Sequence, residues 1–262
     1  MKKFTKLTAF ALALVMALGL LAGCGSSNSD TNSDTNTSGD DAAKTKLVVA
    51  TSPDFPPFES LEGGEVVGIE VDILNKVAEK MGMELDLQQM DFDSVIPGVQ
   101  AGKFDVGMSG ITVTDKRKEN VDFSSVYFMA AQAIVVTADS GITGKADLEG
   151  KKVSVQTGTT AEEYCMGNGY EVLAFTANND AAAALTAGKV DAWVVDNEVA
   201  LAMAPELGLT VLDEAMTSEP YAFAFAKDSA LTAQFDEALG ELLADGTVAA
   251  IFEKYGVLYV AP

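Results

Sequence analysis

The feature that most constrains this fold is an alternation of short apolar runs with amphipathic segments, which begins at Lys46. The run KLVVAT at 46–51 is rich in β-branched residues and predicts a buried strand. Residues 69–81 carry apolar side chains at helical spacing and end at Gly82, which predicts a helix capped by glycine. The alternation continues with a predicted strand at 84–87, a predicted helix at 93–101 and a predicted strand at 104–108. This order is typical of a parallel α/β sheet.

The same rhythm restarts in the second half of the chain, which predicts a second α/β unit. Its predicted strands and helices lie at 152–156, from 161 onward, and at 179–188, 190–195 and 197–203. A predicted strand at 221–226 then leads to helices at 231–255 that return to the first unit. Two segments, 127–137 and 218–226, connect the units, so we expect two lobes with a cleft between them. The predicted first lobe is 46–128 with 222–262, and the predicted second lobe is 129–221.

Polar and aromatic residues gather where the predicted strands of the first unit end. In α/β sheets, ligands bind beyond the carboxyl ends of the strands. Gly110 allows a backbone to approach a ligand closely, and the hydroxyl groups beside it can form hydrogen bonds. The residues that fall at this edge are Ser52, Phe55, Phe92, Ser109, Gly110 and Thr112.

A single arginine, Arg117, follows this cluster, whereas every other basic residue of the chain is a lysine. The planar, forked guanidinium suits bidentate capture of a carboxylate or a phosphate. The alternative is an ordinary surface charge within the run DKRKE, and spacing alone does not separate the two.

The second unit offers two further candidate sites. The segment TGTT at 157–160 opens the helix predicted from Ala161, and free N–H groups at a helix start favour a negatively charged group. The alternative for this segment is a plain capping turn. Asp196 ends the predicted strand at 190–195, where an aspartate by default caps the helix that follows.

Charge and composition exclude several classes of function. The chain has 17 basic and 39 acidic residues, a net charge of −22, which disfavours nucleic acid and anionic membrane surfaces as partners. It has no histidine, which removes histidine-based triads, proton shuttles and most zinc sites. We therefore expect neither a metal nor a cofactor.

The N-terminal residues predict an export signal and a lipid anchor. Lysines within 1–6 precede an apolar run at 7–22, which has the length of a signal peptide rather than of a membrane span. The ending LAGC resembles the bacterial lipobox, so we expect cleavage after residue 23 and lipidation of Cys24; the alternative is an ordinary secretory signal. The rest of 24–45 lacks large apolar side chains and predicts a disordered tether. The expected location is the outer face of the bacterial cytoplasmic membrane, held only by acyl chains.

The chain resembles the extracellular solute-binding proteins of polar amino-acid ABC transporters in six segments: PPFE, GIEVDI, DFDSVIPGVQAGKFD, GITVTDKRKENVDFS, DLEGKKVSVQTGTT and VDAWVVD. The resemblance covers Lys46 to Tyr255. It implies an α/β, two-lobed, type II periplasmic-binding-protein-like fold with two mixed or parallel sheets, flanking helices and a two-strand hinge. It also implies a monomer without enzymatic activity that binds a free amino acid in the cleft and delivers it to an ABC transporter permease.

The resemblance further implies a role for each candidate residue. Arg117 would grip the α-carboxylate of the ligand, and Asp196 would take its α-ammonium. Phe55 and Phe92 would sandwich its aliphatic part. Further contacts to the carboxylate or the ammonium would come from Ser109, Gly110, Thr112, Thr159 and Thr160.

Arg117 and Asp196 together are called the clamp here. The identity of the bound amino acid depends on the end of the cleft that lies away from this clamp. Many relatives carry aspartate at the position of Ser52, and the position of Gln156 varies widely. Residues 52–59 contain three prolines and predict a stiff, non-helical loop, and Glu59 is the acid of its PPFE motif. If it points inward, arginine or lysine is favoured, because an unpaired buried carboxylate is costly. If it faces solvent or a backbone amide, a polar neutral side chain such as glutamine is favoured. We favour a basic amino acid.

An enzyme of the same fold is the alternative function. Some proteins of this fold are dehydratases that act on small carboxylates, and Glu59 would then be the candidate general acid or base. Cys165 is predicted to be a solitary thiol, because Cys24 is assigned to lipidation.

Overall fold

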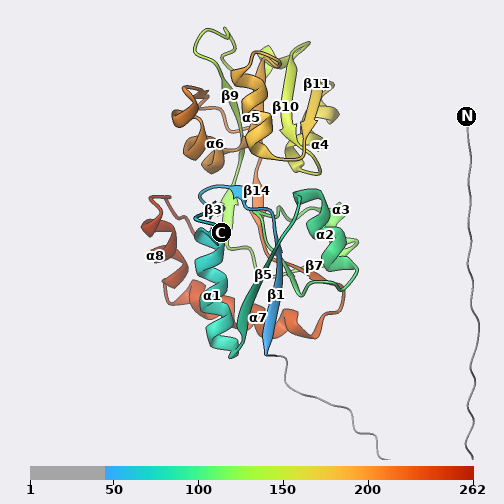
Figure 1. The fold of residues 1–262 in the computed structure, drawn as a ribbon, viewed down its shortest axis with the longest axis vertical. Coiled ribbons are helices and arrows are strands. Elements are labelled where there is room, and N and C mark those ends of the chain that lie inside the picture. Colours follow the sequence, from blue (N-terminus) through green and yellow to red (C-terminus); the bar gives the residue numbers. More distant parts are fainter. Residues whose placement is uncertain (1–44) are drawn as a thin grey trace, which may run out of the picture. The chain divides into compact units, whose positions relative to one another are not determined.

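The computed structural model describes residues 45–262, so the predicted signal peptide, Cys24 and nearly all of the predicted tether lie outside the described residues. Two five-stranded sheets, each flanked by helices, make up this part of the chain (Figure 1). No helix within 45–262 has the length and hydropathy that a membrane span requires. The α-helices are α1 (Ile69–Met81), α2 (Phe92–Gln100), α3 (Asp115–Lys118), α4 (Thr160–Gly167), α5 (Asn178–Thr186), α6 (Asn197–Met203), α7 (Ala230–Ala244) and α8 (Thr247–Lys254).

The first sheet mixes parallel and antiparallel strands. Its strands, in order across the sheet, are β5 (Glu84–Gln89), β1 (Lys46–Thr51), β6 (Val106–Gly107), β15 (Ala224–Ala226) and β7 (Val121–Phe123). Strand β1 pairs in parallel with β5 and β6, whereas β15 runs antiparallel to β6 and β7. Because β15 comes from the last part of the sequence, the chain returns to complete the sheet with which it began.

Helices cover both faces of the first sheet. Along β1, Leu47 and Val49 belong to the large apolar cluster that includes side chains of α1, α7 and α8. Ala50 belongs instead to the cluster formed with α2. Alternate residues of a strand point to opposite faces, so one short strand supplies both halves of the core.

The second sheet is built on the same principle. Its strands, in order, are β11 (Glu171–Phe175), β10 (Lys152–Gln156), β12 (Ala192–Asp196), β9 (Gln132–Val136) and β13 (Thr210–Val211). Val194 packs in the cluster that contains Ala161 and Cys165 of α4. Trp193 and Val195 pack in the cluster that contains residues of α5 and α6. Cys165 is buried and pairs with no other cysteine within 45–262, and burial raises the pKa of its thiol to about 12.

Two small sheets lie outside these layers. Strands β8 (Phe128–Ala130) and β14 (Glu219–Tyr221) pair antiparallel where the chain passes between the two large sheets. Strands β2 (Asp54–Phe55), β3 (Glu59–Glu62) and β4 (Glu65–Val67) form a small antiparallel sheet. The sequence predicts a loop through 52–59, and that prediction is wrong in part, since both ends of this segment enter strands that pair across the intervening prolines.

Other differences concern short or half-exposed elements. The strand predicted at 221–226 is two strands, because β14 ends at Tyr221 and β15 starts at Ala224 after the N–H of Phe223 has turned to the hydroxyl of Ser124. The strand predicted at 104–108 is only two residues long. Strand β11 is not predicted at all, because its side chains are mostly exposed at the edge of the sheet and show no apolar alternation.

Candidate functional site

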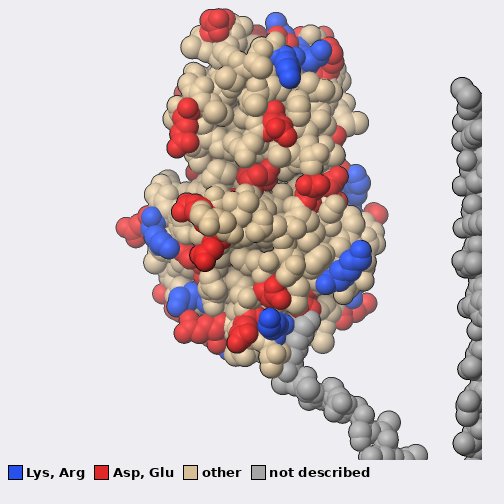
Figure 2. Space-filling view, in the orientation of Figure 1, with Lys and Arg blue, Asp and Glu red and all other residues tan. Residues whose placement is uncertain are grey.

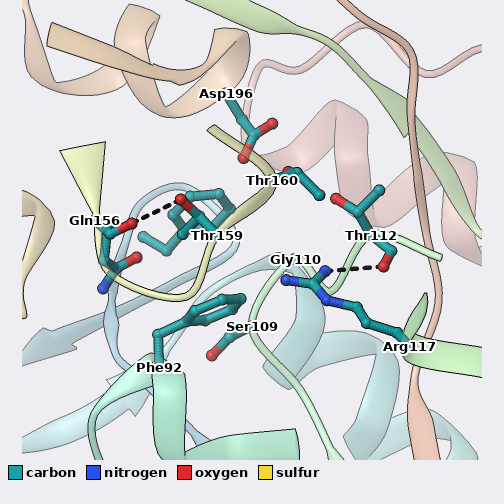
Figure 3. A pocket seen from close by; sticks show the side chains of 10 residues that line it. Phe92, Ser109, Gly110, Thr112, Arg117, Gln156, Thr159, Thr160 and Asp196 are labelled. Carbon is teal, nitrogen blue, oxygen red and sulfur yellow. Dashed lines mark hydrogen bonds between the residues drawn. The ribbon is translucent and has the colours of Figure 1, made fainter. Parts of the chain in front are cut away.

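A small cavity lies at the carboxyl ends of strands from both large sheets, with an empty volume of about 230 Å³. The cavity brings together ten of the twelve residues that the sequence predicts for ligand binding (Figure 3). In Figure 3, Asp196 and Thr160 lie on one side of the cavity, and Phe92 and Ser109 lie on the other. The residues that line it are Phe55, Phe92, Ser109, Gly110, Thr112, Arg117, Gln156, Thr159, Thr160 and Asp196.

Arg117 is held in place by the short helix α3 and by backbone carbonyls. Thr114 caps this helix by accepting the N–H of Arg117 at 3.1 Å. The guanidinium donates from Nη1 to the carbonyl of Thr112 at 2.8 Å and from Nη2 to the carbonyl of Gly158 at 3.1 Å. It also lies 5.6 Å from the centre of the Phe92 ring, within the range of a cation–π contact.

The guanidinium of Arg117 has no acidic partner in this part of the chain. None of the ion pairs found within 45–262 includes it. Burial lowers its pKa, yet a guanidinium stays charged in proteins. A partly buried cation that faces a cavity without a counter-ion is a site for an anion. This geometry favours the capture role over an ordinary surface charge.

Asp196 supplies the acidic group of the site. It is 8% exposed, and it occupies the N-cap position of α6, although its carboxylate accepts no hydrogen bond from the N–H groups of that helix. Oδ1 instead accepts from the side-chain amide of Gln132 at 2.8 Å. Burial, and then the charge of Glu219, raise the pKa of Asp196 to about 8. A cationic group placed beside it would favour its ionised form.

Gln132 is a functional candidate that the sequence prediction missed. It begins β9 and is fully buried, and its amide nitrogen also donates to the hydroxyl of Thr160 at 3.3 Å. It therefore joins the strand that carries Asp196 to the start of α4. A signal was present, because Gln132 is the one polar side chain in the apolar run FMAAQAIVV.

The start of α4 is in part the capping turn that the sequence left open as an alternative. Thr159 is the N-cap, and its hydroxyl accepts the N–H of Glu162 at 3.2 Å while donating to the carbonyl of Gln156 at 2.7 Å. That hydroxyl is therefore fully engaged within the protein. The hydroxyl of Thr160, by contrast, still has its proton to donate toward the cavity.

Ser109 and Gly110 form one wall of the cavity through an unusual backbone. Ser109 has φ 147° and Gly110 has φ 51°, a pair of values that places both residues in the left-handed half of the map. The hydroxyl of Ser109 accepts the N–H of Ser52 at 2.7 Å, and the N–H of Gly110 donates to Glu70 at 3.0 Å. A Cβ on Gly110 would lie 2.5 Å from the ring of Phe55. With its N–H engaged, Gly110 has only its carbonyl left to offer a ligand.

The end of the cavity at Gln156 is set by a residue that the sequence prediction also missed. The carboxylate of Asp54 accepts from the amide of Gln156 at 3.2 Å and from the N–H of Asn178 at 2.7 Å. Asn178 is the first residue of α5, and its own amide donates to Oε1 of Gln156 at 2.9 Å. Burial raises the pKa of Asp54, while these donors act in the opposite direction. Asp54 thus puts a carboxylate directly behind Gln156.

Two predicted site residues lie outside the cavity. Ser52 is buried, and its hydroxyl donates to Asp54 at 3.1 Å, so it supports the cavity from behind. Glu59 is fully buried and does not line the cavity. Neither expectation for Glu59 is met, because the first residue of β3 points into the interior beside Glu70 rather than into the cleft or toward solvent.

Comparison with protein families gives a match over almost all of the described residues. The model of the bacterial extracellular solute-binding proteins, family 3, matches residues 47–257. The arginine-binding extracellular protein ArtP of Bacillus subtilis (strain 168) is 35% identical over 243 residues, which cover 90% of this chain and 92% of that protein.

Solved structures give the same picture. An ancestral arginine-binding protein bound to glutamine superposes with a TM-score of 0.77 at 40% identity, covering 81% of this chain and 98% of that one. An ancestral arginine-binding protein bound to arginine superposes with a TM-score of 0.76, at the same identity and coverage.

Proposed function

This chain belongs to family 3 of the bacterial extracellular solute-binding proteins, and we propose that it binds a basic amino acid, arginine before lysine, in the cavity between its two large sheets. It has the two-lobed type II periplasmic-binding-protein fold, and its function is to bind an amino acid for an ABC transporter. It is a binding protein and not a dehydratase, since its relatives are named for the amino acids that they bind.

The observation that carries the proposal is a guanidinium and a carboxyl group that line one small cavity, each without an ion-pair partner in the described range. Arg117 and Asp196 both line it, and neither forms an ion pair with another residue of the described range. A zwitterion offers a carboxylate for the first and an ammonium for the second. Buried polar groups must be paired, and such a ligand would pair Arg117 and Asp196 with its own carboxylate and ammonium.

The preference for a basic side chain rests on the remaining charges. Asp54 lies behind Gln156, and Glu219 is close enough to raise the pKa of Asp196, whereas Arg117 is the one basic residue that lines the cavity. A ligand with one extra positive charge offsets this surplus of carboxylates. The face shown in Figure 2 also carries acidic side chains over both large sheets, and such a surface raises the local concentration of cationic solutes.

Glutamine is the second candidate ligand. Its amide could pair with Gln156, and one similar structure is an ancestral arginine-binding protein bound to glutamine. Glutamate and aspartate are expected to bind worst, because they would add a carboxylate where no second basic residue lines the cavity.

We expect calorimetric titration of 45–262 to give an affinity order of arginine, lysine, glutamine and then glutamate. Asp54→Asn keeps the acceptor for Asn178 but removes the charge, so it should lower arginine affinity about tenfold relative to glutamine affinity. Asp91→Asn, which removes an exposed charge from the groove beside Asp54, is the matched control and should leave the ratio unchanged. Tight glutamate binding, or an unchanged ratio in Asp54→Asn, would refute the preference for a basic ligand.

We further propose that residues 46–128 with 222–262 and residues 129–221 move as two lobes, with β8 and β14 as the hinge, in a monomer. Support comes from the mixed sheets and from the antiparallel pairing of β8 with β14 between them. Because both charges of the clamp belong to one chain, the site needs no second subunit.

Cleavage after residue 23 and lipidation of Cys24 would anchor the protein to the outer face of the cytoplasmic membrane, with 25–45 as the tether. The support is the LAGC sequence after an apolar run. A Cys24→Ala substitution should move the protein from the membrane fraction to the soluble or secreted fraction, as measured by immunoblotting after fractionation. Protein that stays with the membranes would contradict this anchor.

A further inference from the structure

Two glutamates, Glu59 and Glu70, share one fully buried space beneath the cavity. Each is 0% exposed, one at the start of β3 and the other in the first turn of α1. The backbone of Glu70 contacts the residue before Glu59, since the N–H of Glu70 donates to the carbonyl of Phe58 at 3.1 Å. A Cβ on Gly68 would lie 2.9 Å from the Cα of Glu59. The two carboxyl groups therefore start from adjoining positions in the same interior.

The two carboxyl groups differ in their partners. Glu70 accepts two hydrogen bonds, from the N–H of Gly110 at 3.0 Å and from the hydroxyl of Tyr127. Neither oxygen of Glu59 has a hydrogen-bond donor among the described residues. A buried carboxylate without donors is destabilised, and it can escape by keeping its proton. Glu70 thus has the surroundings of a carboxylate, and Glu59 has those of a carboxylic acid.

The groups that face Glu59 from the neighbouring elements support this division. Burial, and then the charge of Glu70 on α1, raise the pKa of Glu59 well above its usual value. Asp54 on β2 acts in the same direction. The hydroxyl of Ser109, which does not meet Glu59 with hydrogen-bond geometry, opposes the shift by less than burial and Glu70 cause it. Tyr127 contacts the same pair, and burial together with Glu70 raises its own pKa, so it keeps its proton as well. No basic residue is among these groups.

We propose that Glu59 is a positioning residue that keeps its proton at neutral pH and donates it to Glu70, so that Glu70 holds the N–H of Gly110 and fixes the wall of the cavity. The chain of contacts then runs from β3 through α1 to the segment after β6. The effect on ligand affinity rests on the proposed amino-acid binding, whereas the protonation of Glu59 does not depend on it.

The wall of the cavity needs such support because its backbone is not one that the chain adopts freely. Ser109 is a non-glycine residue at φ 147°, and conformations of this kind persist only where surrounding contacts impose them. The ring of Phe55 packs against Gly110 from the cavity side, and Glu70 holds its N–H from below. Releasing Glu70 would free the peptide between Ser109 and Gly110 to rotate, and would thereby loosen two residues that line the cavity.

The test compares Glu59→Gln, which keeps a donor of the same shape without the charge, with Glu59→Ala, which keeps neither. Glu62→Gln removes an exposed glutamate from the same strand and is the matched control. The infrared comparison is made in ligand-free protein that carries Asp196→Asn throughout, because Asp196 is a second buried carboxyl group expected to hold a proton at pH 7. At neutral pH we expect the carbonyl band of an un-ionised buried carboxyl group when Glu59 is present, also in Glu62→Gln, and no such band in Glu59→Gln. Absence of the band while Glu59 is present would overturn the proposal even if neither variant at position 59 folded.

Thermal melting gives a second test, because a merely structural role of Glu59 would not change how the melting temperature depends on pH. A carboxyl whose folded pKa is raised stabilises the protein most below its unfolded pKa of about 4.3, and this contribution is lost as the pH rises toward the folded pKa. The melting temperature of the wild type should therefore fall relative to that of Glu59→Gln between about pH 5 and pH 8. A difference that does not change with pH would overturn the proposal.

Arginine titration tests the positioning role. Glu59→Gln should bind arginine within about threefold of the wild type, whereas Glu59→Ala should lose about tenfold or more and should shift the amide resonance of Gly110. Equal losses in the two variants would overturn the role. If no amino acid binds the wild type, the proposed function fails, and the infrared and melting results still decide where the proton lies.

Discussion

Replacing Arg117 with alanine is expected to weaken arginine binding by about 30-fold to several thousand-fold, which corresponds to about 2–5 kcal/mol. The guanidinium has no counter-ion within the described range, and the carboxylate of the ligand would lose its one cation. Its hydrogen bond to Gly158 also joins the polar edge of the first sheet to that of the second, so the variant loses a contact between the two proposed lobes as well. Calorimetry of the purified variant measures the loss directly.

Two further variants separate charge from shape. Arg117→Lys restores the charge but not the fork, so it should recover only part of the affinity. Lys118→Ala removes an exposed neighbour in the same short helix and should bind arginine as the wild type does. The thermal midpoint of ligand-free Arg117→Ala should stay close to that of the wild type. An affinity loss below about threefold would contradict the proposed orientation of the ligand.

Replacing Asp196 with asparagine should cost about 30-fold or more in arginine affinity, because the α-ammonium loses its carboxylate. Asparagine has nearly the same shape and can still accept from Gln132, so the variant should fold. Asp139→Asn, which removes an exposed charge from a turn of the second half of the chain, is the control and should bind normally. Equal affinities for wild type and Asp196→Asn would show that the ammonium lies elsewhere.

The same residue should make binding depend on pH. With a pKa of about 8 in the free protein, Asp196 holds a proton at pH 7, and an ammonium ligand lowers that pKa by favouring the ionised form. Binding should therefore release a proton, and affinity should rise with pH up to about 8 before levelling. Calorimetry in two buffers of different ionisation enthalpy measures the released proton. Asp196→Asn should release none from this position, and an identical proton release in both proteins would contradict the assignment.

The parts of the fold that sequence predicts well are those where burial follows a simple period. Strand β1, helix α1 with its glycine cap and strand β10 lie where the apolar pattern predicts them. The pattern fails at β11, because an exposed edge strand has no apolar face to reveal it. It also fails at β14 and β15, since a continuous apolar run does not mark the residue at which a chain leaves one sheet for another.

The candidate site divides in the same way. Arg117, Asp196 and Gly110 follow strand ends, so the rule for α/β sheets places them in one region. Asp54 and Gln132 could not be predicted in this way, because their importance comes from partners more than sixty residues away. Glu59 was misplaced because its direction depends on the pleat of β3, within a segment that the prolines had marked as a loop.

Some contacts join the two large sheets even without a ligand. Their strength decides how closely the closed shape of the protein is tied to the presence of a bound amino acid. Asp54 binds the N–H of Asn178, Arg117 binds Gly158, and the exposed pair of Lys116 and Glu163 adds about 0–1 kcal/mol. The apparent affinity equals the intrinsic affinity scaled by the fraction of molecules in the binding-competent state. Stronger contacts would also let empty molecules close, and a transporter that recognises the closed shape would then be engaged without cargo. If the two proposed lobes close on the ligand, the contacts between the sheets must therefore stay weak enough for the amino acid itself to be the signal for closure.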